Sequence, residues 1–109
     1  MLVVEMVARQ GTSGKETKVL FGLVMKARPA TMQERSARRV RWQVPEGANV
    51  VGEYWFEGDD PSVVAIVETE DAGAVTRIRL AWDDLFDIAV FPVVTAEEGL
   101  ERLRQIMPA

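Results

Sequence analysis

Two carboxylates stand in the middle of segments whose apolar residues predict β-strands, where charged side chains are unusual. Glu5 lies within residues 2–8, and Glu53 lies within residues 50–56. If both side chains point into an apolar enclosure, desolvation raises their pKa values and makes them candidate general acids or bases. The alternative is structural, because either carboxylate could pair with an arginine or reach solvent. The structural alternative is the more common one for such residues.

Strand periodicity places an aromatic side chain beside Glu53. Alternation over residues 50–56 puts Glu53 and Trp55 on one face and Tyr54 and Phe56 on the other. If Tyr54 and Phe56 pack under helices, the opposite face forms an apolar enclosure, and Trp55 either stacks on a ligand or packs in an interface. The ligand-lining residues predicted on that face are Val3, Val51, Trp55 and Ile66. A one-residue bulge in this strand would turn Glu53 outward and leave Tyr54 in its place.

The chain contains neither histidine nor cysteine. It therefore lacks the most frequent general base, the usual proximal haem ligand and the Cys or His ligands of zinc sites. Catalysis would have to use carboxylates, Lys, Tyr, Arg or the reactivity of the substrate itself. We expect no cofactor, no haem and no tightly held zinc.

The charge balance bears on possible partners. The net charge is −4, which disfavours nucleic acid because phosphate binding depends on Lys and Arg. One basic cluster stands out, formed by Lys26, Arg28, Arg35, Arg38, Arg39 and Arg41. We expect it to be a solvated helix face paired with Glu34, and an anionic ligand or RNA is the alternative.

Hydropathy and the first residues indicate where the protein functions. No stretch approaches the roughly 18 apolar residues of a membrane-spanning helix. The first five residues have no basic lead-in and include Glu5, unlike a signal peptide. We expect a cytoplasmic protein without a membrane partner, which the absence of cysteine also fits.

The elements alternate in an order typical of one fold. Strands are predicted at 2–8, 50–56, 63–67 and 88–94, and helices at 15–28, 32–42, around Val75, Ile78 and Trp82, and at 96–106. Thr31 and Thr95, each followed three residues later by Glu, are predicted N-caps. This order predicts one ferredoxin-like α+β domain over residues 1–109, a split βαβ with an antiparallel sheet ordered four-one-three-two. Pro92 cannot donate to a ladder, so the fourth strand is expected at an edge.

The third and fourth strands are apolar on both faces. In this fold the helices cover one face of the sheet, so the other would expose a large apolar patch. Packing two sheets face to face in a homodimer removes that patch. A monomer whose tail crosses the face is the alternative.

Two segments resemble the dimeric α+β barrel superfamily and, within it, a small bacterial family of unknown function. They are PEGANVVGEYW at 45–55 and AWDDLFDIAVFPVV at 81–94, with Glu97-Glu98 after the second and ETEDA at 68–72 between them. After Gly52 that family tends to have Arg-Trp-His, whereas this chain has Glu53-Tyr54-Trp55. A ligand contact made by that Arg or His is therefore not expected here.

The resemblance implies an uncharacterised small-molecule-binding dimer, with its pocket between sheet and helices or in the barrel lumen and a small apolar or aromatic ligand. It also implies an alternative, a cofactor-independent monooxygenase, isomerase or cyclase acting on an aromatic or polyketide-like substrate. In that case Glu5 or Glu53 would be the base, and Asn49 or Tyr54 would stabilise an oxyanion. A regulatory or interaction module without catalysis is the third possibility.

Overall fold

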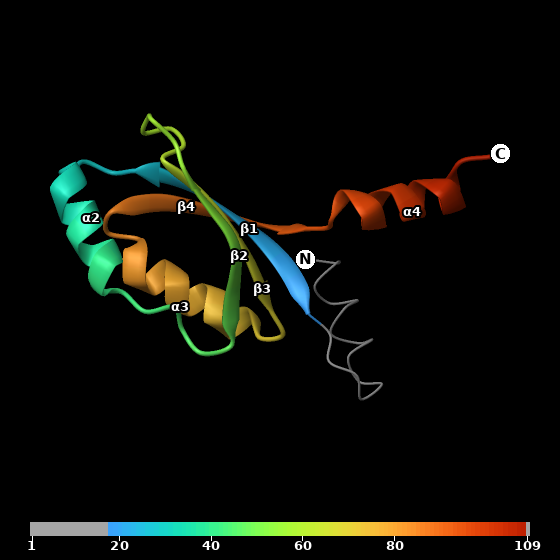
Figure 1. Cartoon of the computed structure of the whole chain (residues 1–109), viewed down its shortest axis with the longest axis horizontal. Coiled ribbons are helices and arrows are strands. Elements are labelled where there is room, and N and C mark those ends of the chain that lie inside the picture. Colours follow the sequence, from blue (N-terminus) through green and yellow to red (C-terminus); the bar gives the residue numbers. More distant parts are fainter. Residues whose placement is uncertain (1–17, 109) are drawn as a thin grey trace.

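The computed structural model describes residues 18–108, which form four strands and three helices (Figure 1). In chain order they are β1 (Val19–Ala27), α2 (Met32–Arg41), β2 (Ala48–Trp55), β3 (Val63–Thr69), α3 (Ala72–Trp82), β4 (Phe86–Val93) and α4 (Ala96–Ile106). This β-α-β-β-α-β order with a C-terminal helix confirms the predicted ferredoxin-like α+β fold.

The four strands form one antiparallel sheet in the order β2-β3-β1-β4. This is the four-one-three-two order predicted from the sequence, read from the other edge, but residues 19–27 take the place that was predicted for residues 2–8. Among the described strands β4 pairs only with β1, so Pro92 lies in an edge strand, as its missing N–H requires. Loop 58–61 turns the chain between β2 and β3, as predicted.

The helix predicted at 15–28 is wrong over residues 19–27, which form the central strand β1. The helical interpretation grouped Val19, Leu20, Leu23 and Val24, and this grouping cannot separate a helix from a strand in a short apolar run. In the structure Phe21, Leu23 and Met25 alternate into the core. β1 is paired on both sides and apolar on both faces, which is the pattern of an interior strand. The strand predicted at 2–8 lies outside the described residues.

Helix starts follow the predicted capping chemistry. Thr31 Oγ1 accepts a hydrogen bond from Glu34 N at 3.0 Å, and Glu34 Oε1 accepts one from Thr31 N at 3.2 Å, which completes a capping box. Thr95 Oγ1 accepts from Glu98 N at 3.1 Å. Both predicted N-caps are thereby confirmed.

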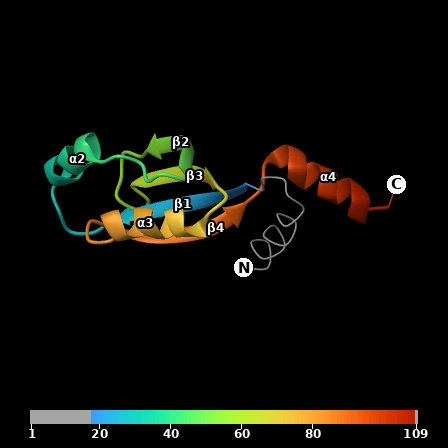
Figure 2. The ribbon, with the colours of Figure 1, turned by 90° about the horizontal axis from the view of Figure 1, so that it is seen from below.

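The core lies between one face of the sheet and helix α3. Val75, Ile78 and Trp82 of α3 are buried against side chains of β1, β3 and β4, among which Leu23 and Val67 are nearly inaccessible. The predicted placement of Trp82 in the core is confirmed. Helix α2 lies on the same side, and α4 projects from the end of β4 away from the sheet (Figures 1 and 2). Among the described residues, no helix has the length and apolar content needed to cross a bilayer.

A β-bulge in β2 reverses the predicted faces of its second half. Val50 lies opposite Val67, but Gly52 lies opposite Ile66, so Val51 has no partner in β3. The extra residue moves every later side chain to the other face. Glu53 now lies opposite Ala65 and Trp55 opposite Val63, on the helix-covered face, and Tyr54 lies opposite Val64 on the uncovered face.

Thr69 should stabilise the junction between β3, α3 and the turn before β2. Its side chain is 2% exposed, and its hydroxyl lies 2.6 Å from Gly47 O and accepts from Asp71 N at 2.9 Å. Thr69→Val leaves both backbone groups without this partner, so we expect a loss of about 1–3 kcal/mol in the free energy of unfolding. Chemical denaturation measures it. The matched control is Thr76→Val, at an exposed position of α3, and an equal loss in both variants would contradict the interpretation.

Candidate ligand pocket between the sheet and helix α2

A pocket of about 300 Å³ opens between the sheet, helix α2 and the loop that joins β2 to β3. Its floor is the apolar core, including Leu23, Ala65 and Trp82. Its walls carry Ser36 and Arg39 from α2 and polar side chains from β2 and its following loop. An apolar cavity with a few polar groups is the usual composition of a small-molecule site, and 300 Å³ is at the lower end of their sizes.

Helix α2 docks through arginines and has no buried residue. Three guanidinium groups lie over aromatic rings: Arg35 over Phe86 at 6.0 Å, Arg38 over Trp82 at 5.6 Å and Arg39 over Trp42 at 5.5 Å. The three rings are themselves in contact, since the Trp82 centroid lies 5.7 Å from those of both Trp42 and Phe86. Arg38 also donates to Asp84 and to Ala81 O. Long side chains thus span the space between α2 and the core.

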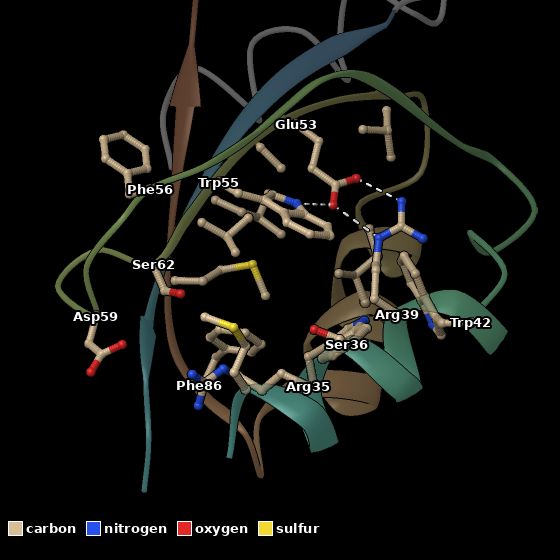
Figure 3. A pocket seen from close by; sticks show the side chains of 18 of the residues that line it. Arg35, Ser36, Arg39, Trp42, Glu53, Trp55, Phe56, Asp59, Ser62 and Phe86 are labelled. Carbon is tan, nitrogen blue, oxygen red and sulfur yellow. Dashed lines mark hydrogen bonds and ion pairs between the residues drawn. The ribbon is translucent and has the colours of Figure 1, made fainter. Parts of the chain in front are cut away.

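Glu53, Arg39 and Trp55 form the polar wall of the pocket (Figure 3). Arg39 donates Nη2 to Glu53 Oε1 at 2.8 Å and Nε to Glu53 Oε2 at 3.0 Å. The Trp55 indole donates Nε1 to the same Oε2 at 2.8 Å. This two-point pair fixes α2 to β2 across the pocket, and its bidentate geometry adds directional specificity.

The ion pair stabilises the charged form of both partners. Hydrogen bonding from Arg39 lowers the pKa of Glu53, and this outweighs the opposing effect of burial; the Trp55 bond lowers it further. The same hydrogen bonds raise the pKa of Arg39 above its usual value. Glu53 is therefore an ionised, hydrogen-bonded carboxylate at neutral pH. Such a group holds a ligand or a helix in place but is a weak proton acceptor.

The structure gathers only part of the predicted site. Glu53 and Trp55 line this pocket, on the helix side of the sheet rather than on the face first assigned to them. Val51 is the unpaired residue of the bulge, and Tyr54 and Ile66 lie on the uncovered face. Asn49 Nδ2 lies 3.5 Å from Glu68 Oε1, outside the pocket lining. Val3 and Glu5 lie outside the described residues.

Sequence reasoning missed the contribution of α2 to this pocket. Arg35 and Arg39 were assigned to a solvated face paired with Glu34, but Arg39 pairs with Glu53 and both line the pocket. Their spacing of four residues, which places them on one face of a helix, was the available signal. Trp42, which follows the helix, completes the wall. Over residues 18–108, no three acidic side chains are grouped closely enough to hold a metal ion.

Glu53 should contribute to stability in a pH-dependent way. Its pKa is lower in the folded state, so its contribution is present above the ordinary carboxylate pKa and is lost as pH falls through the lowered value. We expect Glu53→Gln to lose about 1 kcal/mol of unfolding free energy at neutral pH. The difference from the unmodified protein should shrink in acid, as measured by urea denaturation across pH.

Glu101→Gln is the control for this measurement. It removes the partner of Arg104 in an exposed pair on α4, where solvent screens the charges. We expect a smaller loss than for Glu53→Gln. A difference for Glu53→Gln that persists unchanged below the carboxylate range would contradict the pKa argument.

Comparison with known proteins identifies a family but no activity. No curated protein and no solved structure shows significant similarity to the chain. One family matches over residues 20–107, from the start of β1 to the end of α4, and it is described as a domain of unknown function, DUF3303. The match spans every strand and helix of the described fold and the whole pocket. The chain is therefore a member of the DUF3303 family.

Proposed function

We propose that this protein binds a small apolar or aromatic molecule in the pocket between the sheet and helix α2. The observation that carries the proposal is the pocket itself, about 300 Å³ with an apolar floor and the Glu53–Arg39–Trp55 wall. A few fixed polar groups over an apolar cavity orient a ligand whose burial supplies most of the affinity.

The exposure of the Trp55 indole supports a binding site rather than an imperfectly packed core. The polar wall is satisfied without a ligand, because Glu53 accepts from Arg39 and Trp55. Trp55 nevertheless keeps 65% of its surface exposed although it lies at the pocket. An exposed indole held by a hydrogen bond at the edge of a cavity is a rigid surface on which an aromatic ligand can stack.

Binding is favoured over the catalytic alternative by the state of Glu53. A general base at neutral pH needs a pKa near the working pH, and Arg39 moves the pKa of Glu53 the other way. The two suggested oxyanion donors, Asn49 and Tyr54, do not line this pocket. Catalysis by this constellation is therefore the weaker proposal.

Tryptophan fluorescence offers a direct test, because all three tryptophans of the chain line the pocket. We expect the neutral aromatic probe hydrocinnamamide to change this fluorescence saturably. Ser36→Trp, which places an indole into the pocket from α2, should weaken binding about tenfold or more by occupying the cavity. Calorimetry measures the affinities independently of fluorescence.

The matched control is Ala37→Trp, one residue along the same exposed helix and outside the lining. It should bind as the unmodified protein does. Equal loss in both variants would refute the proposed site, and so would the absence of saturable binding by the unmodified protein for hydrocinnamamide and for charged probes of the same shape.

We further propose a homodimer that packs two uncovered sheet faces together. This face carries apolar side chains from all four strands, among them Leu20, Val24, Ile66 and Phe91, with Tyr54 at one edge strand. Phe91 is 52% and Tyr54 61% exposed in the single chain. A second copy buries this surface without altering the pocket, which lies on the opposite face.

Phe91→Glu should weaken the dimer, because it places a charge on the apolar face that is proposed to form the interface. Sedimentation velocity at micromolar concentration should give a dimer for the unmodified protein and a shift toward monomer for the variant. Leu80→Glu, at a 70% exposed position on α3, is the control and should remain dimeric. A monomeric unmodified protein would contradict the proposed assembly.

A further inference from the structure

We infer that the pocket selects an apolar carboxylate, an anion whose oxygen atoms are held by Arg35 and whose apolar body lies on the pocket floor. This inference rests on the proposed function and adds the chemical class of the ligand. The inference follows from the N–H donors of the Arg35 guanidinium that make no hydrogen bond to another described residue.

Arg35 is a half-buried cation at the pocket without a carboxylate partner among residues 18–108. Its Nη1 donates to Ala30 O at 3.1 Å, and its guanidinium lies over the Phe86 ring. A guanidinium has five N–H donors, so this single bond leaves four for another acceptor. Burying a charge without a counter-charge is costly, and an anionic ligand removes that cost.

Arg39, the other arginine that lines the pocket, has the carboxylate partner that Arg35 lacks among the described residues. Arg39 stands one helical turn further along α2 and is paired at two points with Glu53 (Figure 3). Arg38, between them, is paired at two points with Asp84. Of these three neighbouring arginines, each stacked on an aromatic ring, Arg35 alone has no carboxylate to hold within the described residues.

The acidic side chains of the pocket would gain less from binding a cationic ligand than Arg35 would gain from binding an anionic one. Glu53 already accepts three hydrogen bonds. Glu57 and Asp59 lie on the loop after β2, where they are exposed and water solvates them. An exposed carboxylate gains little from an ionic partner, whereas a half-buried guanidinium gains more.

The positions of these groups define the shape of the ligand. Arg35 lies beside Phe86, and Trp55 lies on the opposite side of the pocket, against β2 (Figure 3). A carboxylate held by Arg35 therefore leaves its hydrocarbon part in the apolar space between Arg35 and the Trp55 indole. A compact aromatic or short aliphatic monocarboxylic acid has this form.

Three probes that share a phenylpropyl body separate charge from shape: hydrocinnamate, hydrocinnamamide and phenylpropylammonium. Isothermal titration calorimetry on the full chain should rank them in that order, with the carboxylate about tenfold tighter than the amide. Arg35→Gln should reduce hydrocinnamate affinity to that of the amide and leave amide affinity unchanged. Arg41→Gln removes an exposed charge of the same helix outside the pocket lining and should change neither.

The outcomes distinguish this inference from the function on which it rests. Equal affinity for carboxylate and amide overturns the inference but leaves the binding site standing. Tightest binding of the ammonium overturns it in favour of recognition by Glu57 and Asp59. No binding of any probe refutes the site itself. If Arg35→Gln lowers the melting temperature because its contact with Phe86 is lost, the probe ranking on the unmodified protein still decides.

Discussion

The docking of helix α2 through arginines is the interaction on which the pocket depends. A helix that buried apolar side chains would lie directly against the sheet and fill the space above Leu23 and Ala65 with its own residues. Helix α2 buries none, and instead Arg35, Arg38 and Arg39 lie over a row of three aromatic rings. Each such contact contributes about 0.5–1 kcal/mol where it is exposed, so the helix is held by several modest polar contacts. Because arginine side chains are long, they hold helix α2 at a distance from the sheet, and a cavity remains between the two.

The bulge at Val51 gives the second half of β2 its role at this cavity. Without the extra residue, Glu53 would lie on the uncovered face and Arg39 would have no carboxylate opposite it. With it, Glu53 and Trp55 complete the wall that faces α2. The same pairing sets the chemistry of the site, since a carboxylate whose pKa is lowered by an arginine remains charged and orients its neighbours. A local irregularity in one strand therefore decides both where the polar groups lie and what they can do.

The two faces of the sheet have different surroundings. One packs against α3 and borders the pocket, whereas the other is apolar and has no described helix over it. Helix α4 has a similar imbalance, because it extends from the edge strand with Leu100, Leu103 and Ile106 about half exposed or more. Its remaining surface carries the Glu98–Arg102 and Glu101–Arg104 pairs. These exposed apolar surfaces are separate from the pocket, which lies on the covered side of the sheet.

The sequence alone determined the fold class, because its signals are local or follow from backbone chemistry. Thr31 and Thr95 marked helix starts by capping, Pro92 required an edge strand, and the spacing of Val75, Ile78 and Trp82 identified the core helix. The strand at 19–27 was missed because its apolar residues satisfy helical spacing as well as alternation, and only pairing with β3 and β4 distinguishes the two. Only the tertiary structure determined which side chains line the pocket and how they pair. Glu53 and Trp55 were identified as candidates, but a bulge beside Gly52, which the alternation of residues 50–56 left open, set their face. Arg39, 14 residues away, became the partner of Glu53 only when α2 folded over β2.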